Sequence, residues 1–352
     1  MASEIRSSAL QITCQLDAPR GWHQYVTRHP QSSLYHDPRW AELIQRTFSH
    51  RTFFLACEAD SHGALAGALP LVYLKSRIFG RALISMPYFN YGGLLADNDA
   101  VALQLVSAAL DLQRKLGADY IELRQAAPIP GTWPIKSHKV IMLLPLPPDP
   151  DALWTSFKTK LRTRVRRAEK ENFTLHWGKQ ELLDDYYGVF AENMRDLGTP
   201  VYSKDFFRTI LNTFPENAHI ATVRRGPDCL AAGFLLSYRG KMEVPWASSL
   251  RRFNHLSPNM LLYWHMLRQS LSEGCRTFDF GRSTRGSGTY QFKEQWGAAP
   301  LETFWVYPGQ DANNLPDHSP QSKKFLLATR IWQKLPLGIT NRVGPYLVKN
   351  IP

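Results

Sequence analysis

One short pattern occurs twice in the chain, and it limits the folds that the sequence can adopt. The two runs start 157 residues apart, as Gly117-Ala118-Asp119-Tyr120-Ile121-Glu122-Leu123 and Gly274-Cys275-Arg276-Thr277-Phe278-Asp279-Phe280. In each, a glycine closes a predicted helix and a run typical of a strand follows at once. Ala66-Gly67 and Ala232-Gly233 also correspond, at a spacing of 166 residues. We therefore predict a duplicated α/β unit built on a mixed sheet.

The length agrees with two such units. The chain has 352 residues, of which 44% are apolar, enough to fill two cores, and domains of roughly 150 residues are typical. The segment 144–150 contains four prolines, which disfavour a helix and suit a linker. We predict an N-terminal domain at 1–145, a C-terminal domain at 146–310 and a basic tail at 311–352.

Apolar periodicity, cap residues and turn residues predict the elements of each half. The first half has two helices within 21–50, the second started by Asp37-Pro38, then an antiparallel meander of strands at 52–57, 64–74 and 81–87 with a turn at 60–63, a helix at 99–116 and a strand at 120–124. The second half has helices at 180–196, 203–213 and 259–272 and strands at 219–224, 229–238, 241–250 and 277–280. The predicted fold class is α/β, in the α+β sense, with a largely antiparallel mixed sheet flanked by helices in each half.

The formal charge of +12 is concentrated in two segments. Residues 157–172 carry seven Lys or Arg against two Glu, and residues 321–352 carry six against no acid. This distribution favours a phosphate-rich partner or a membrane surface, with solvated helix faces as the alternative. In the first segment, one basic helix with a buried stripe is expected, because apolar residues recur at helical spacing at Leu153, Phe157, Leu161, Val165 and Ala168. We expect the second segment to contact a membrane as a basic, aromatic surface or else to dock on the domain.

The cysteines, the histidines and the N-terminus argue against several classes of protein. Four scattered cysteines and eleven histidines form neither a C-x-x-C pair nor an H-E-x-x-H motif, so neither a disulfide framework nor a metal site is predicted. Residues 1–17 lack the layout of a signal peptide, and no apolar run approaches the roughly 18 residues of a spanning helix. We therefore expect a cytoplasmic protein whose tail contacts the inner face of the membrane.

Ionisable residues gather where the last predicted strand of the second half ends. Asp279 lies in that strand, Arg282 and Ser283 follow it, and Tyr290 and Lys293 return a few residues later. Acyl transfer to an amine needs a carboxylate or a tyrosine that handles protons, and a lysine or arginine near the developing charge. These residues are therefore a candidate reaction site. The structural alternative is that Asp279 and Arg282 form an ion pair and that Lys293 is an exposed helix residue.

A neighbouring strand supplies further candidates. Glu243, Trp246 and Ser248 share one face of that strand by the two-residue period, so they line the same site or belong to the core or its rim. The nearby glycine-rich run at 281–288 lacks the Gly-Lys-Ser/Thr ending of a nucleotide-binding loop, so a kinase or ATPase is not predicted.

The segment Leu256-Ser257-Pro258-Asn259 predicts a helix start with serine as its cap. Helix N-termini bind anions, and acyltransferases of the GNAT fold hold the donor's pyrophosphate where a strand, a loop and a helix start follow in this order. The candidate donor-phosphate residues are Ser257 and Asn259, with Arg162 and Arg166 of the basic segment. No R/Q-x-x-G-x-G/A run occupies the loop, which counts against acetyl-CoA as the donor.

Four stretches carry a family resemblance. Residues 33–40 (SLYHDPRW) look like the opening segment of one family of transferases, and 87–93 (PYFNYGG) lie where that family has a Pro-x-Gly-Pro turn. Residues 160–172 are similar to the Arg-rich, Ala-x-Lys-x-Gly segment of the same family. Residues 292–297 (FKEQWG) resemble an F-K-x-x-F-G signature whose lysine is placed at the acyl-transfer centre. Over about residues 20–307 the chain thus resembles the FemAB-type aminoacyl and peptidyl transferases. It is most similar to the subgroup associated with exosortase/PEP-CTERM exopolysaccharide systems.

The resemblance implies tandem GNAT-like domains with an acceptor groove between them. It implies a cytosolic enzyme that joins an amino acid or another acyl group to a small-molecule, glycan or peptide amine. The donor is an aminoacyl-tRNA or an acyl-CoA, no cofactor is permanently bound, and no DNA partner is expected. Carried over by position, Asn90, Tyr91 and Gly92 belong to the acceptor site. Two departures weaken parts of this: the helical-hairpin arm of tRNA-using members is missing, and Gly93 stands where the family has proline.

The leading hypothesis is an N-acyltransferase of cell-envelope or exopolysaccharide biosynthesis. Lys293 stabilises the oxyanion or the donor phosphate, Asp279 or Tyr290 handles protons, and Arg282 orients the acceptor or an anionic donor group. The alternative from another class is a non-catalytic protein that binds a nucleotide- or lipid-linked sugar in an assembly complex through the two basic segments.

Overall fold

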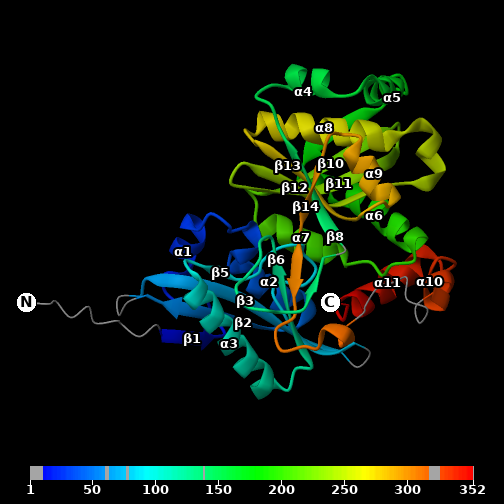
Figure 1. The fold of residues 1–352 in the computed structure, drawn as a ribbon. Helices are drawn as coiled ribbons and strands as arrows, with labels where there is room; N and C mark the ends of the chain where they lie inside the picture. Colours follow the sequence, from blue (N-terminus) through cyan, green and yellow to red (C-terminus); the bar gives the residue numbers. More distant parts are fainter. Residues whose placement is uncertain (1–10, 60–62, 77–78, 138, 317–325, 352) are drawn as a thin grey trace, which may run out of the picture. The chain divides into compact units, whose positions relative to one another are not determined.

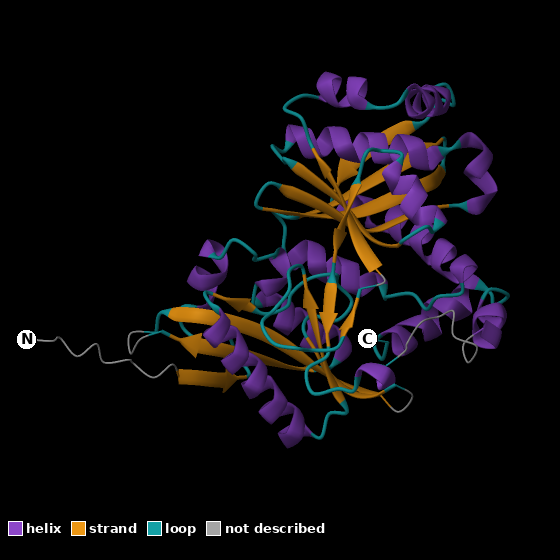
Figure 2. Cartoon of the chain, in the orientation of Figure 1, coloured by secondary structure: helices purple, strands orange, loops and turns teal. Residues whose placement is uncertain are grey.

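The computed structural model describes residues 11–59, 63–76, 79–137, 139–316 and 326–351. The described residues form two compact units, 11–137 with 302–316 and 139–301 with 326–351. Each unit is built on one mixed sheet with helices packed on it (Figure 1, Figure 2). The predicted fold class is confirmed.

The first unit contains an eight-stranded sheet in the order β1-β2-β3-β4-β6-β15-β7, with β5 paired to β3. Its strands are β1 (Gln11–Gln15), β2 (Arg51–Glu58), β3 (Leu65–Ser76), β4 (Gly80–Ile84), β5 (Leu95–Ala96), β6 (Tyr120–Gln125), β7 (Ile135–Lys136) and β15 (Phe304–Val306). Its helices are α1 (Trp22–Arg28), η1 (Leu34–His36), α2 (Arg39–Phe48), α3 (Asp99–Leu116) and η4 (Ala312–Asn314). Strands β4 and β6 are the parallel pair of this sheet.

The second unit contains a seven-stranded sheet in the order β14-β8-β13-β12-β11-β10-β9. Its strands are β8 (Lys139–Pro145), β9 (Thr174–Gly178), β10 (Ala218–Arg225), β11 (Asp228–Tyr238), β12 (Lys241–Ser249), β13 (Thr277–Thr284) and β14 (Ala299–Glu302). Its helices are α4 (Pro150–Ser156), α5 (Thr159–Glu169), η2 (Gln180–Leu182), α6 (Leu183–Leu197), α7 (Lys204–Thr213), η3 (Arg251–Leu256), α8 (Pro258–Ser272), α9 (Gly288–Glu294), α10 (Leu326–Trp332) and α11 (Leu337–Val348). Strands β12 and β13 are the parallel pair.

The two sheets have the same strand order when the second is read from β9 to β14, which confirms the predicted duplication. The parallel pair occupies the same place in each, and each pair is joined at three residue positions. Helix α3 lies in the chain between β4 and β6, the parallel pair of the first sheet, just as α8 lies between β12 and β13. The repeated runs at 117–123 and 274–280 supply β6 and β13.

The repeated Ala-Gly pairs lie in the corresponding strands β3 and β11, and the glycines have a packing reason. A Cβ on Gly67 would stand 2.5 Å from Val101 of α3, and one on Gly233 would stand 2.7 Å from the sulfur of Met266 of α8. In both units, therefore, the connecting helix approaches the sheet closely at the glycine, and a Cβ there would force a helix side chain to move.

In each sheet, the sixth strand comes from a segment that the predicted boundaries placed in the other domain; the second sheet is again read from β9. The first sheet takes β15, which follows the second unit in the chain, and the second sheet takes β8, which ends inside the predicted linker at 144–150. The predicted division at 1–145, 146–310 and 311–352 thus differs from the compact units. The reason is that strand pairing, and not the proline content, decides where Leu144 and Pro145 belong: they pair with Phe278 and Thr277.

Both faces of each sheet are covered. In β2, Phe53, Leu55 and Cys57 join the core under α3, whereas Phe54 and Ala56 join the core under α1. This explains why the strand is buried almost continuously instead of at alternate residues. In the second unit one core lies under α5 and α8, and an aromatic cluster lies under α6 and α7.

The predicted single basic helix is wrong, because it is interrupted. Its stripe is buried as expected at Leu153, Phe157, Leu161, Val165 and Ala168, but α4 ends at Ser156 and α5 begins at Thr159. Phe157 has an extended backbone. Its ring packs edge-on to Trp264 and Trp296, with centroids 5.9 and 5.5 Å away. Burial of this ring in the core, together with the hydroxyls of Thr155 and Ser156 that bond back to helix carbonyls, ends the first helix.

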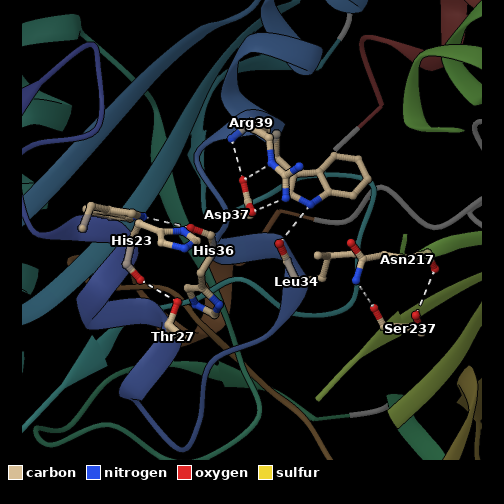
Figure 3. A network of polar contacts seen from close by, with 10 residues as sticks. His23, Thr27, Leu34, His36, Asp37, Arg39, Asn217 and Ser237 are labelled. Carbon is tan, nitrogen blue, oxygen red and sulfur yellow. Dashed lines mark hydrogen bonds and ion pairs between the residues drawn. The ribbon is translucent and has the colours of Figure 1, made fainter. Parts of the chain in front are cut away.

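The segment before α2 is fixed by local hydrogen bonds (Figure 3). The Asp37 carboxylate accepts from the backbone N–H of Arg39 at 2.9 Å and from its guanidinium at 2.8 and 2.9 Å. The indole of Trp40 donates to the Leu34 carbonyl at 3.0 Å. Asp37 therefore acts at the helix start as predicted, although α2 begins one residue later than the proline.

Two further observations complete the comparison with the sequence. Of the turn predicted at 60–63, residues 60–62 lie outside the described part of the chain. Arg239 and Gly240 form the turn between β11 and β12, with positive φ of 49° and 75°. None of the helices in the described ranges is both long enough and apolar enough to cross a membrane.

The placement of β15 yields a prediction. Val306 is 1% exposed in the core of the first unit, so Val306→Asp buries an unpaired charge there at a cost of about 3 kcal/mol or more. We expect amide hydrogen exchange in β6 to accelerate about a hundredfold, while β13 stays protected. Leu301→Asp, at a 40% exposed position, is the control and leaves both strands protected. Equal acceleration in β6 and β13 would contradict the placement.

Candidate active site

The site is organised by the end of the parallel ladder between β12 and β13. The strands pair at Lys241–Thr277, Met242–Phe278 and Glu243–Asp279, and their pairing stops there. The register of β12 against β11 shifts just after Glu243, where Pro245 has no N–H to donate. The register of β13 against β8 shifts between Asp279 and Arg282. The two strands therefore diverge, and their backbone groups must find other partners.

Asp279 stands at this point and is completely buried. One carboxylate oxygen, Oδ1, accepts from the backbone N–H of Gly281 at 2.8 Å. The other, Oδ2, lies 3.6 Å from Nζ of Lys241. Asp279 thus forms an ion pair with Lys241 of the neighbouring strand. The partner suggested by the sequence, Arg282, is exposed.

Lys293 approaches the same irregularity from α9. This helix begins after Ser287, whose hydroxyl accepts from the backbone N–H of Tyr290. The Lys293 side chain is 8% exposed, and its Nζ donates to the carbonyls of Gly281 at 3.1 Å and Arg282 at 3.0 Å. The alternative in which Lys293 is an exposed helix residue is therefore wrong.

Burial decides the protonation of this lysine. Desolvation lowers the pKa of Lys293 to about 8, the nearby Asp279 carboxylate opposes the lowering, and Arg282 adds to it. The three groups form a chain in which Asp279 orients Gly281 and the carbonyls of Gly281 and Arg282 hold the ammonium. Such an ammonium, fixed and largely removed from water, is suited to stabilising negative charge.

Tyr290 precedes Lys293 by three residues and therefore lies on the same side of α9. Its ring is half-buried and packs against the core of the second unit. Ser283 is buried, and its hydroxyl has no hydrogen-bond partner among the described residues.

Sequence reasoning missed two lysines at this end of the sheet. Lys241 pairs with Asp279 as described, and Lys139 of β8 donates to the Thr284 hydroxyl at 2.6 Å. Burial lowers the pKa of Lys139, and the positive charge of Arg282 lowers it further. No motif marks either lysine, because each reaches the site only through strand pairing.

Glu243, Trp246 and Ser248 share one face of β12 as predicted, but the two-residue period is not the reason for Glu243 and Trp246. Glu243 and Trp246 are three residues apart, so simple alternation would place them on opposite faces. At the register shift, β12 has one residue more than β11, so Leu236 lies opposite Glu243 and Phe234 lies opposite Trp246 on the same face. Glu243 is buried beside Asp279. Trp246 packs edge-on to Phe207 of α7 at 5.2 Å.

Ser248 is also held by the helix layer. Its hydroxyl accepts from the Asn193 side chain of α6 at 3.0 Å. Trp246 and Ser248 therefore contribute to the packing under α7 and α6, whereas Glu243 lies opposite Asp279 in the parallel ladder.

The donor-phosphate residues are arranged differently from the expectation. Helix α8 starts at Pro258, but Ser257 has φ 57° and its side chain makes no capping hydrogen bond. The left-handed backbone of this residue replaces the extended geometry that serine capping requires.

The two arginines assigned to the donor lie on α5. The Arg162 guanidinium lies 3.5 Å from the Thr159 hydroxyl, and that of Arg166 lies 5.6 Å from the centre of the Trp154 ring. Helix α5 packs on α8. Among the described residues, no hydrogen bond joins either arginine to Ser257 or Asn259.

Asn90, Tyr91 and Gly92 belong to the first unit. Gly92 has φ 108°, and a Cβ there would stand 2.5 Å from Met86, so the turn requires glycine. The next residue, Gly93, accepts a hydrogen bond at its carbonyl from Nε2 of His36 at 2.9 Å.

The first unit has its own buried charge network where its parallel ladder ends. Glu122 pairs with Ile84 there, in the place of Asp279. Its Oε1 accepts from Nε of Arg124 at 2.8 Å, its Oε2 accepts from the Tyr307 hydroxyl at 2.6 Å, and Arg124 also donates to the Phe89 carbonyl at 2.8 Å. Burial raises the pKa of Tyr307, and Glu122 raises it further. The repeated runs already placed Glu122 at the position of Asp279.

Within the described ranges, no group of three or more His, Cys, Asp or Glu residues could hold a metal ion.

Comparison with known proteins bears on the fold of both units. Residues 155–294, inside the second unit, match the family described as acetyltransferase (GNAT) domain. The crystal structure of FemX is similar over 83% of this chain and 96% of that chain, with TM-score 0.64 and 15% identity. The structure of L-PGS from Bacillus licheniformis is similar over 91% and 99%, with TM-score 0.53 and 13% identity.

A tandem GNAT protein from the clavulanic acid biosynthesis pathway is similar over 85% of this chain and 97% of that chain, with TM-score 0.50 and 11% identity. The chain has a tandem GNAT-like fold. No curated protein matches it. The part of the chain that matches the GNAT acetyltransferase family lies in the second unit, and the candidate residues from Glu243 to Lys293 lie within the matched range.

The buried ammonium yields a prediction about stability. The folded pKa of Lys293, about 8, lies below its ordinary value of 10.5, so folding disfavours the charged form. This penalty is fully present below pH 8 and disappears as the pH rises through 10.5, and it corresponds to about 3 kcal/mol. In urea unfolding, we expect the stability of the unmodified protein to rise by about that amount relative to Lys293→Met between pH 8 and 10.5. Lys293→Arg cannot deprotonate and should show no rise; a rise in that variant would contradict the assignment.

Proposed function

We propose that the protein is an N-acyltransferase that joins an aminoacyl or other acyl group to an amine in cell-envelope or exopolysaccharide biosynthesis. The observation that carries the proposal is Lys293, a buried ammonium held by two carbonyls where the parallel strands of a GNAT-type domain diverge. A structural role alone gives no reason to bury a lysine at a cost in stability.

The proposed reaction begins with attack of the acceptor's amine nitrogen on the carbonyl carbon of the donor. The carbonyl oxygen becomes an oxyanion, which the Lys293 ammonium stabilises. Collapse of this intermediate breaks the C–O bond of an ester donor or the C–S bond of a thioester donor and leaves an amide. The amine loses one proton, and the leaving oxygen or sulfur gains one.

Burial assigns separate roles to the two candidates for proton handling. Asp279 is closed off from solvent and bound to the Gly281 N–H, so we propose that it positions the carbonyls that hold Lys293. Tyr290 is half-buried on the same side of α9, so its hydroxyl accepts the amine proton while giving its own to the leaving group. Arg282, exposed beside Lys139, orients an anionic group of a substrate.

Two donor classes fit the chemistry. The match to an acetyltransferase family supports an acyl-CoA. The C-terminal domain of a putative lysylphosphatidylglycerol synthetase from Agrobacterium fabrum is 12% identical with TM-score 0.53. That protein is named for an aminoacylated product, which supports an aminoacyl-tRNA. The missing R/Q-x-x-G-x-G/A run favours the second, and the acceptor is a small-molecule, glycan or peptide amine. The resemblance to the exosortase/PEP-CTERM-associated subgroup supports exopolysaccharide as the pathway, and we include that pathway in the proposal.

A non-catalytic protein that binds a nucleotide- or lipid-linked sugar is the second candidate. The exposed basic face of α5, with Arg164, Arg166 and Arg167, favours it. A covalent product separates the two functions, since binding alone leaves donor and acceptor unchanged.

The role of Lys293 predicts a kinetic effect. Donors of both classes are incubated with amino-sugar and peptide acceptors, and products are identified by mass spectrometry. We expect Lys293→Met to lower kcat about 100- to 1,000-fold, as loss of one oxyanion donor does, with little change in the KM for the acceptor. Glu294→Gln, at the exposed neighbouring position, is the control and keeps full activity. Unchanged transfer by folded Lys293→Met would reject the mechanism, and no product from any pair would favour the binding protein.

The donor class predicts a salt dependence. If the donor is an aminoacyl-tRNA held by α5, log affinity falls linearly with log salt by about 0.7 to 0.9 for each phosphate contact. We expect a steep fall for charged tRNA, and a slope reduced by between about one and two in Arg162→Gln/Arg166→Gln. Arg276→Gln, at an exposed position outside the basic segment, is the control and keeps the full slope. A flat response would count against an aminoacyl-tRNA as the donor.

A further inference from the structure

The C-terminal helices α10 and α11 are docked on the second unit by one face only. Trp332, Thr340, Gly344 and Val348 are buried; the last three recur every four residues on α11. A Cβ on Gly344 would lie 2.9 Å from Val201, which explains the glycine in this close contact. The Gln333 side chain donates to the Asp196 carbonyl at 3.1 Å. The tail thus docks on the second unit through one face, which was the predicted alternative to membrane contact. The opposite face of the two helices is therefore the one that faces outward.

The outer face is apolar. Leu327 and Ile331 are one turn apart on α10, and Ile339, Val343 and Tyr346 form a stripe on α11. Leu327 and Tyr346 are each 68% exposed. Of the eleven large apolar side chains that are exposed among the described residues, six lie between Leu326 and Tyr346. Scattered exposed apolar residues need no explanation, but a concentration of this kind marks an interaction surface.

Basic residues frame the apolar stripe, and no acid accompanies them. Arg330 and Lys334 belong to the first helix and the turn after it, and Arg342 and Lys349 belong to the second helix and its end. Nζ of Lys349 lies 5.9 Å from the centre of the Tyr346 ring. From residue 321 to the end the sequence contains no Asp or Glu. The outer face therefore combines exposed leucine, isoleucine, valine and tyrosine with positive charge alone.

We propose that this face of α10 and α11 binds the surface of an anionic phospholipid bilayer. The apolar side chains enter the boundary between headgroups and acyl chains while the lysines and arginines attract anionic headgroups, as in helices that lie in a membrane interface. The charge pattern complements such a surface. An RNA partner explains the basic residues but leaves the exposed Leu327, Ile331 and Val343 without a function, so the bilayer is favoured. The proposal does not depend on the reaction, because binding requires neither donor nor acceptor.

Vesicle co-sedimentation with the full chain tests the surface. We expect binding to vesicles of phosphatidylglycerol with phosphatidylcholine and no binding to phosphatidylcholine alone. Leu327→Asp/Ile331→Asp should weaken binding at least about tenfold, because it removes apolar insertion and adds negative charge. Arg330→Gln/Lys334→Gln should weaken it by about fivefold per charge, the effect of a basic residue close to an anionic surface.

Matched variants on the first unit distinguish this surface from general effects of charge. Leu103→Asp is at a 43% exposed position of α3, and Arg46→Gln/Lys115→Gln removes two exposed charges outside the tail; all should bind as the unmodified protein does. Circular dichroism and thermal unfolding confirm that the tail variants are folded. Failure of the unmodified protein to bind anionic vesicles would overturn the proposal. The proposal would also be overturned if the tail variants and the control variants lost vesicle binding equally. It would be overturned too if the tail variants lost tRNA binding but kept vesicle binding.

Discussion

The candidate site depends on a parallel ladder that is only three residue pairs long. Beyond Glu243 and Asp279 the strands β12 and β13 no longer satisfy each other's backbone groups, and buried N–H and C=O groups must have partners. The Gly281 N–H bonds to Asp279, and the carbonyls of Gly281 and Arg282 bond to Lys293. The irregularity that separates the strands therefore also brings an acid and a cation to the same place. Because the cation is buried, its pKa is lowered.

The first unit repeats this ladder but closes its end differently. Glu122 stands in the register of Asp279, and both of its carboxylate oxygens are bound by side chains, those of Arg124 and Tyr307. The Arg124 guanidinium lies 4.2 Å from the centre of the Trp305 ring. In the second unit the cation comes from a helix after the strand and is held by backbone alone. A closed ion network in one copy and a titratable ammonium in the other support assigning the chemistry to the second copy.

Much of the fold was predictable from local signals. Helix α3 has the predicted bounds and ends at Gly117 with φ 61°, and β10, β11 and β12 lie within one or two residues of prediction. Three of the differences, in β8, β15 and the basic helix, share one cause. Strands β8 and β15 are recognisable only by their partners, β13 and β6, which lie more than 130 residues away in the sequence. The basic helix breaks at Phe157 because two tryptophans from distant segments receive its ring. Pairing and packing over such distances leave no periodicity in the local sequence.

The sequence by itself determined the duplication, the position of Lys293 after a strand that contains Asp279, and the acid-free basic tail. These follow from residue types at fixed spacings, and the structure keeps all three. Only the tertiary structure decided that Lys293 is buried on two carbonyls, that Lys241 is the partner of Asp279, that Lys139 joins them, and which face of the tail is exposed. Burial and ion pairing depend on which segments meet in space, and long-range strand pairing sets that.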